Sequence, residues 1–301
     1  MVWIPDGEFA MGSTEFYPEE RPVHREQVDG FWLDQHPVTV AEFRRFVKAT
    51  GYRTTAETAP SADDFPDADP GRLVPGSLVF RPTSGPVRLD DYTQWWAWTP
   101  GADWRHPEGP GSTVDGRDRH PVTHVSLFDA RAYAAWADKE LPTEAEWEFA
   151  ARGGLDGARF AWGDEELVHH RRQANSWQGE FPWQNLLDDG YAGTSPIGAF
   201  PASPYGLFDI TGNVWEWTVD PWTTDHAPRS GIAPGSGSAS SCCTPAGPGS
   251  AATEPYPRRV VKGGSHLCAP SYCLRYRPAA RQGQTEDTST GHLGFRCLVR
   301  S

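Results

Sequence analysis

Glycine and proline interrupt this chain so often that they limit the length of any helix or strand. The 301 residues include 31 glycines and 28 prolines, about one residue in five. Glycine destabilises helix and strand interiors and proline removes a backbone donor, so both concentrate in turns. The 14 tryptophans and 14 phenylalanines can still fill a core, because each aromatic side chain buries a large area. The sequence therefore predicts one compact α+β domain, residues 1–301, with little regular secondary structure.

Three short helices are predicted from their capping residues. In each, a Ser or Thr is followed three residues later by Glu or Asp, the capping box in which side chains and backbone amides of the first turn bond reciprocally. Two of the helices then end at a glycine, Gly51 or Gly153, the residue preferred just beyond a helix C-terminus. The boxes pair Thr39 with Glu42, Ser126 with Asp129, and Thr143 with Glu146.

Short strands are expected near both ends of the chain. Residues 2–13 and 25–36 contain strand-like segments joined by a polar turn, and residues 258–266 and 293–300 supply the final strands. These final strands are expected to flank the opening stretch. Residues 52–118 are rich in proline, aspartate, glycine and tryptophan without any period, which predicts mostly loop.

The formal charge of -13 argues against a nucleic-acid partner, because phosphate binding requires a basic surface. The first residues lack the basic and apolar regions of a signal peptide, and no apolar run of about 18 residues could span a membrane. The five cysteines are an odd number, and Cys242 and Cys243 are adjacent within residues 227–255, a low-complexity stretch interpreted as a flexible insertion. We therefore expect a monomer in a reducing cytoplasm, without membrane attachment.

Several common motifs are absent or weak. The sequence has neither a glycine-rich nucleotide-binding loop nor a G-x-S-x-G nucleophile motif. His120 and His124 have a spacing that suits zinc on a helix, but Pro121 and the strand-like VTHVS segment favour a structural role. The aromatic segment WWAWTP, residues 95–100, is interpreted as core in preference to a binding platform.

Two segments carry oxygen ligands suited to a hard cation. Asp209 and Glu216 bracket a turn at Gly212, where backbone carbonyls can also point inward. Asn175 and Asp189 can meet across a loop in the same way. Calcium binds roughly six to eight oxygens from carboxylates and carbonyls. Each segment is therefore either a calcium site or a set of ordinary Asx turns.

Cys268 and Cys273 are five residues apart, and several interpretations fit that spacing. A disulfide, a redox couple, a two-thiolate Cu(I) site and two buried apolar residues all remain open. Zinc would need further ligands, and no second cysteine pair lies near in sequence. The neighbouring residues are polar or cationic, which favours a functional thiol pair over a core role. They are Ser265, His266, Tyr272, Arg275, Tyr276, Arg277 and Arg281.

The sequence resembles the formylglycine-generating enzymes, or sulfatase-modifying factors, from Val2 to Cys297. The segments that carry the resemblance are VWIPDGEFAMGS, LPTEAEWEFAARGG, FDITGNVWEW, GGSHLCAPSYCLRYRPAARQ and GHLGFRC. The resemblance implies a fold related to the C-type lectin-like fold. It also implies a copper-dependent oxidase that uses O2 to convert the cysteine of a Cys-x-Pro-x-Arg motif in a sulfatase polypeptide to formylglycine.

The same resemblance assigns Cys268 and Cys273 as the ligands of Cu(I), which the substrate cysteine then joins as a third thiolate. Other residues at the cleft are expected to organise the sulfur and oxygen species and to exclude water. These are Ser265, Tyr272, Arg277 and Trp215. Two calcium sites are also implied. Their ligands are Asn175, the Ser176 carbonyl, Asp189 and the Tyr191 carbonyl in one site, and Asp209, the Gly212 and Val214 carbonyls and Glu216 in the other.

The sequence departs from the secreted animal members of this family at their cysteines. Where those members form disulfides, this chain has Ala134, Ala151 and Pro278, so Cys297 is expected to be a free buried thiol. His292 stands where those members have an asparagine near the cleft, which leaves the role of that position open.

Two alternative functions come from the same fold: a lectin-like binding module and an iron-dependent sulfur oxidase. A binding module would have no need of the pair Cys268 and Cys273. The oxidase usually carries an added helical-bundle domain with a histidine-rich iron site, and these 301 residues contain no such segment.

Overall fold

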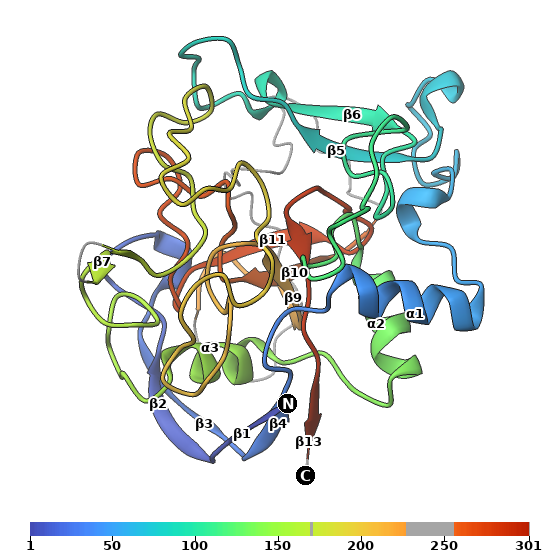
Figure 1. Cartoon of the computed structure of the whole chain (residues 1–301). Coiled ribbons are helices and arrows are strands. Elements are labelled where there is room, and N and C mark those ends of the chain that lie inside the picture. Colours follow the sequence, from blue (N-terminus) through green and yellow to red (C-terminus); the bar gives the residue numbers. More distant parts are fainter. Residues whose placement is uncertain (169–170, 227–255, 301) are drawn as a thin grey trace.

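The computed structural model describes residues 1–168, 171–226 and 256–300 of the chain (Figure 1). The insertion predicted at residues 227–255, with its two cysteines, lies outside the described residues. Within the described ranges, every helix is too short or too polar to cross a membrane.

All three predicted helices are present, and each begins with its predicted capping box. They are α1 (Val40–Thr50), α2 (Leu127–Trp136) and α3 (Glu144–Arg152). Gly51 and Gly153 adopt the left-handed conformation that ends α1 and α3. α1 packs beside α2 at one side of the molecule, whereas α3 packs against the central strands (Figure 1).

A four-stranded sheet occupies the centre of the molecule (Figure 1). β10 (Arg258–Lys262) pairs antiparallel with both β11 (Arg281–Thr285) and β9 (Trp215–Pro221), and β12 (Leu293–Gly294) pairs in parallel with β9. Residues 263–280 connect the neighbouring strands β10 and β11 and contain both cysteines of the predicted pair. We call this segment the cysteine loop.

The first and last strands meet in a separate three-stranded sheet. β1 (Val2–Ile4) and β13 (Leu298–Arg300) both pair antiparallel with β4 (Phe31–Leu33). The expectation that residues 293–300 flank the opening stretch is thus confirmed by β13. It is wrong for the strand predicted within residues 258–266, because β10 is buried between β9 and β11 in the central sheet.

Short strand pairs and 3-10 turns fill the rest of the fold. The prediction of mostly loop for residues 52–118 missed one hairpin, because its two strands lie far apart in sequence. The strand pairs are β2 (Gly7–Met11) with β3 (His24–Val28), β5 (Gly76–Phe80) with β6 (Trp96–Pro100), and β7 (Leu167–Val168) with β8 (Arg171–Arg172). The 3-10 turns are η1 (Pro18–Glu20), η2 (Thr55–Glu57), η3 (Pro70–Arg72) and η4 (Tyr92–Gln94).

The core is largely aromatic and reaches the cysteine loop. One cluster packs α1 and α2 against the central sheet and includes both Cys268 and Cys273. A second packs α3 against β1, β2 and β4. Trp95 and Trp96 belong to a third cluster, which confirms the core interpretation for the start of WWAWTP. Cys297 is free and fully buried, as expected.

Candidate active site

The cysteine loop folds through a series of short turns. The N–H of Cys268 donates to the Ser265 carbonyl at 2.9 Å, and the N–H of Cys273 donates to the carbonyl four residues earlier at 2.8 Å. Gly264 has a φ of +68° and lies so close to the other end of the loop that a Cβ would be 2.7 Å from the Arg275 carbonyl. Only glycine allows this approach, which brings the two halves of the loop together.

The Sγ atoms of Cys268 and Cys273 are 3.3 Å apart. A disulfide bond is about 2.05 Å long, so no disulfide joins these two thiols, and both are buried. The backbone N–H of Ser265 donates to Cys268 Sγ at 3.4 Å. The pair is therefore arranged as two adjacent sulfur ligands.

A small cavity lies against the two sulfur atoms, and its walls are mainly aromatic. The Tyr272 ring stacks on Phe181, with centroids 4.6 Å apart and planes 2° apart. Trp95 meets the same tyrosine ring edge-on at 5.7 Å. The lining residues are Trp95, Trp96, Phe181, Trp215, Ser265, Leu267, Cys268, Tyr272, Cys273 and His292.

Five of the six predicted cleft residues therefore come together at this cavity. They are Cys268, Cys273, Ser265, Tyr272 and Trp215. Sequence reasoning missed Trp95, Trp96, Phe181 and Leu267 as lining residues. The aromatic density of WWAWTP was the available signal, because a packed aromatic segment can also form one wall of a cavity.

Arg277 is the predicted cleft residue that does not line this cavity. Its guanidinium donates to both carboxylate oxygens of Glu20, at 2.5 and 3.0 Å, and to the Leu274 carbonyl at 2.7 Å. The two charged side chains are only 1% and 0% exposed, and the guanidinium lies 3.7 Å from the centroid of the Phe16 ring. Arg277 thus joins the cysteine loop to residues 16–20, and this placement does not support its predicted role at the sulfur atoms.

A second buried ion pair lies beside the first. Arg275 donates to Glu19 at 2.5 Å and lies 3.9 Å from the centroid of the Tyr17 ring. The Tyr17 hydroxyl oxygen accepts from the N–H of Leu274 at 3.1 Å. Burial, with a smaller contribution from the thiol of Cys273, raises the pKa of Tyr17 to about 12. Residues 16–20 therefore support the cysteine loop close to Cys273.

The first predicted calcium cluster contains an unsatisfied ligand atom. Asn175 is 1% exposed, and its Oδ1 has no hydrogen-bond partner among the described residues. Its Nδ2 donates to the Gly193 carbonyl at 2.9 Å, which orients the side chain. The Nε2 of Gln178 donates to both the Ser176 carbonyl and, at 2.6 Å, Asp189 Oδ2. The Ser176 carbonyl and both oxygens of Asp189 thus already accept hydrogen bonds, so the fit to a hard cation rests on the unpartnered Oδ1 of Asn175.

The second predicted cluster is already neutralised by the protein. Glu216 accepts from Arg296 at both carboxylate oxygens, at 2.7 and 2.8 Å, and from the indole N–H of Trp147 at 2.8 Å. Asp209 accepts from Gly198 and Asn213, and burial raises the pKa of its carboxyl to about 6. Both carboxylates of this cluster have donors, as Asp189 does in the first cluster, but here Arg296 also supplies a buried positive charge, so these residues fit a cation less well.

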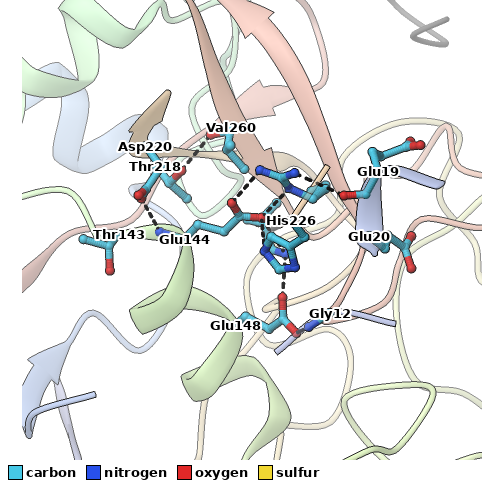
Figure 2. A network of polar contacts seen from close by, with 12 residues as sticks. Gly12, Glu19, Glu20, Thr143, Glu144, Glu148, Thr218, Asp220, His226 and Val260 are labelled. Carbon is cyan, nitrogen blue, oxygen red and sulfur yellow. Dashed lines mark hydrogen bonds and ion pairs between the residues drawn. The ribbon is translucent and has the colours of Figure 1, made fainter. Parts of the chain in front are cut away.

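A third cluster, of Glu144, Glu148 and His226, has a spacing that could hold a metal ion (Figure 2). Lys262 Nζ, however, lies 3.3 Å from Glu144 and 2.9 Å from Glu148. Burial alone would raise the pKa of the Glu148 carboxyl, but Lys262 and a neighbouring arginine outweigh it and hold that pKa at about 2. Arg281 also pairs with Glu144, at 2.8 and 2.9 Å. The carboxylates are therefore neutralised by side chains, as in a structural ion network.

His120 and His124 do not converge on a common ligand, which agrees with the structural role favoured for them. His120 Nδ1 lies 3.0 Å from Thr194 Oγ1, whereas His124 Nδ1 lies 2.7 Å from Ser77 Oγ.

Comparison with known proteins finds similarity along the whole chain. The family model described as Sulfatase-modifying factor enzyme 1-like domain matches residues 1–301. The formylglycine-generating enzyme of Mycobacterium tuberculosis is 52% identical over 299 residues, covering 99% of this chain and 97% of that protein. That of Thermomonospora curvata is 45% identical over 304 residues, covering 99% and 93%. The solved structure of PvdO from Pseudomonas aeruginosa has the same fold, with a TM-score of 0.63, 23% identity and coverage of 99% and 92%.

Proposed function

Because the chain belongs to the sulfatase-modifying factor family, which includes the formylglycine-generating enzymes, we propose that it oxidises a sulfatase cysteine to formylglycine with Cu(I) and O2. The observation that carries this proposal is the contact of Cys268 and Cys273 at 3.3 Å beside a buried cavity. Two adjacent thiolates are the ligands that Cu(I) prefers. The substrate is the cysteine of a Cys-x-Pro-x-Arg motif in an unfolded polypeptide or peptide.

The reaction needs a reductant as well as O2. Conversion of a CH2–SH side chain to an aldehyde removes two electrons and releases the sulfur as hydrogen sulfide. Full reduction of O2 takes four electrons, so two molecules of an external thiol supply the other two and form a disulfide. The balanced products are the aldehyde, hydrogen sulfide, the disulfide and one water. Bound Cu(I) would supply the one-electron chemistry that activates O2.

The residues of the chain hold the reactants and exclude water. Cys268 and Cys273 as thiolates hold the ion, and the N–H of Ser265 stabilises negative charge on the first of them. Trp215 is 1% exposed and forms part of the cavity wall, where its indole would exclude water and so strengthen polar interactions inside. Tyr272 is held by its stack on Phe181 and limits how a peptide can enter. Arg277 acts as a positioning residue through Glu20.

We assign calcium to the cluster of Asn175, Ser176, Asp189 and Tyr191. The support for this site is the buried Oδ1 of Asn175, which has no partner among the described residues, and calcium prefers oxygen ligands of the kinds that this cluster carries. The second cluster, Asp209, Gly212, Val214 and Glu216, stays a prediction from the family resemblance, since Arg296 already supplies positive charge there.

The proposal is tested by incubating the protein with Cu(I), O2, a thiol reductant and a peptide that contains Cys-Thr-Pro-Ser-Arg. We expect mass spectrometry to show conversion of the thiol to an aldehyde. Absence of conversion with copper present would overturn the enzymatic proposal and favour a binding module. A copper titration by a competing chelator, with no peptide present, tests the metal site independently of turnover.

Variants of the three described cysteines provide matched controls. Cys268→Ser and Cys273→Ser should each abolish both copper binding and conversion, because serine is a poor ligand for Cu(I). Cys297→Ser changes a buried thiol that does not line the cavity, and it should retain both activities. A fully active Cys273→Ser variant would contradict the two-thiolate site.

A further inference from the structure

We propose that His292 binds the thiol of the substrate cysteine, accepting a hydrogen bond from its S–H as the peptide enters the cavity. This inference rests on the proposed function and adds a substrate-binding residue to it. His292 lines the cavity together with both cysteines, although it lies on a different segment, next to β12.

The two ring nitrogens of His292 have no hydrogen-bond partner among the described residues. The residue is 1% exposed, and neither Nδ1 nor Nε2 forms a hydrogen bond within the described part of the chain. Leaving a buried polar group unsatisfied costs about 1–3 kcal/mol, so such groups are rare unless a ligand or water completes them. An imidazole without partners, in the wall of a cavity, therefore indicates a polar occupant of that cavity.

The position of the ring is fixed by its surroundings. The ring meets Trp96 edge-on, with centroids 4.7 Å apart. The backbone carbonyl of His292 accepts the N–H of Trp215 at 2.8 Å. Both tryptophans also line the cavity, so the imidazole is held in its wall without using its own nitrogen atoms.

Two neighbouring histidines show the contrast. His266 Nδ1 lies 2.8 Å from the Asn213 carbonyl, and His124 Nδ1 lies 2.7 Å from Ser77 Oγ. Each of these rings has a structural partner at Nδ1, whereas His292 has none at either nitrogen within the described residues. Structural burial alone therefore does not explain the third ring.

The chemistry of the lining selects a thiol donor. Burial, with smaller contributions from His266 and His124, holds the pKa of His292 well below its usual value, so the ring is neutral and keeps one acceptor nitrogen. The indole N–H groups of Trp95 and Trp215 are also unpartnered, and an indole can only donate. A neutral imidazole offers an acceptor nitrogen as well as an N–H, whereas the indoles offer only donors, and the substrate S–H is a donor that must reach the sulfur pair.

The contact is measured by binding to copper-free protein, without O2 and with a phosphine reductant. The probes are a peptide containing Cys-Thr-Pro-Ser-Arg and the same peptide with alanine in place of cysteine. The wild-type protein should bind the cysteine peptide more tightly. In His292→Leu this preference should fall about fivefold, the effect of one neutral hydrogen bond. His120→Leu, the same change at a half-buried histidine outside the cavity, should keep the wild-type preference.

A second measurement does not need a variant to fold. In wild-type protein labelled with 15N-histidine, the cysteine peptide should shift the His292 ring resonances, and the alanine peptide should leave them close to those of the free protein. Equal shifts with both peptides, or an unchanged preference in folded His292→Leu, would overturn the inference while wild-type conversion of the peptide leaves the proposed function standing. If wild-type protein neither binds nor converts the peptide, the proposed function fails and this inference fails with it.

Discussion

The carbonyl oxygen of Asn213 accepts two hydrogen bonds from His266, one from the backbone N–H at 3.0 Å and one from ring Nδ1 at 2.8 Å. The side chain of Asn213 donates to Asp209 at 3.2 Å, and its N–H donates to the Asn175 carbonyl at 2.9 Å. The buried Asn213 therefore joins both predicted calcium clusters to the cysteine loop. It meets the loop at His266, two residues before Cys268.

Replacing Asn213 by glycine should destabilise the protein. Asn213 has a φ of 58°, which glycine also adopts, so Asn213→Gly removes the side chain without backbone strain. The buried groups that it leaves without partners should lower the free energy of unfolding by about 1–3 kcal/mol, measured in urea. Asp138→Gly is the matched control, since Asp138 is exposed with a φ of 56°, and it should show little change. Wild-type stability in Asn213→Gly would contradict the joining role.

Calcium should stabilise the fold through Asn175. Ligand binding to the folded state raises its stability by mass action, so a chelator should lower the melting temperature of the wild-type protein. Asn175→Ala removes the unpartnered Oδ1, and its melting temperature should respond much less to added calcium. Asn185→Ala, in the same region, should respond like the wild type. A melting temperature that changes with neither calcium nor chelator would count against the site.

Breaking the Glu20–Arg277 pair should loosen the cysteine loop. Glu20→Gln leaves a buried guanidinium without its counter-charge, and such changes cost about 3–5 kcal/mol. We expect a lower urea midpoint and faster labelling of Cys268 and Cys273 by an aromatic disulfide reagent. The control is Glu8→Gln, which breaks an exposed pair with Arg25 and should alter neither result. Unchanged labelling in Glu20→Gln would show that the loop does not depend on the pair.

Acid should destabilise the protein partly through His124. Burial lowers its pKa to about 4, against smaller opposing contributions from the Pro107 carbonyl and Glu108. The unfolded chain, with a pKa near 6.5, binds more protons between these two pH values, so the free energy of unfolding falls as pH decreases from 6.5 to 4. The loss from this ring is about 3 kcal/mol.

The variant His124→Asn isolates this contribution. Asparagine tolerates the φ of 58° at this position and binds no proton, so its free energy of unfolding should decrease less between pH 7 and 4. Urea unfolding at a series of pH values gives the comparison. Asp129, whose pKa burial raises to about 6, acts in the opposite direction but contributes equally in both proteins. Parallel pH profiles would contradict the assignment.

Local features of the fold were predictable from the sequence because their causes are local. Each capping box involves residues three positions apart, so Thr143 and Glu146 specify the start of α3 without the rest of the chain. The hairpin of β5 and β6 was missed because its strands pair across a 15-residue connection, and the pairing leaves no mark in the sequence of either strand.

The candidate site was predictable in its cysteines but not in its surroundings. Spacing and neighbouring charges favoured a functional role for Cys268 and Cys273, and the family resemblance predicts copper as their metal. Trp95 and Phe181 reach the cavity through tertiary packing, and Glu20 reaches Arg277 across 257 positions of sequence. Such contacts depend on the arrangement of the whole fold, so patterns within short segments do not show them.

The two buried ion pairs that hold the cysteine loop, Arg275 with Glu19 and Arg277 with Glu20, affect how the site binds its ligands. Arg275 and Arg277 are both paired and buried, so the loop between β10 and β11 is ordered before any metal or peptide arrives. The conformational entropy of placing the two sulfur atoms side by side is lost when the chain folds, and little remains to be lost on binding. A free peptide with the same two cysteines would have to lose that entropy at the moment of binding, and it should therefore hold a soft metal ion less tightly than the folded protein does.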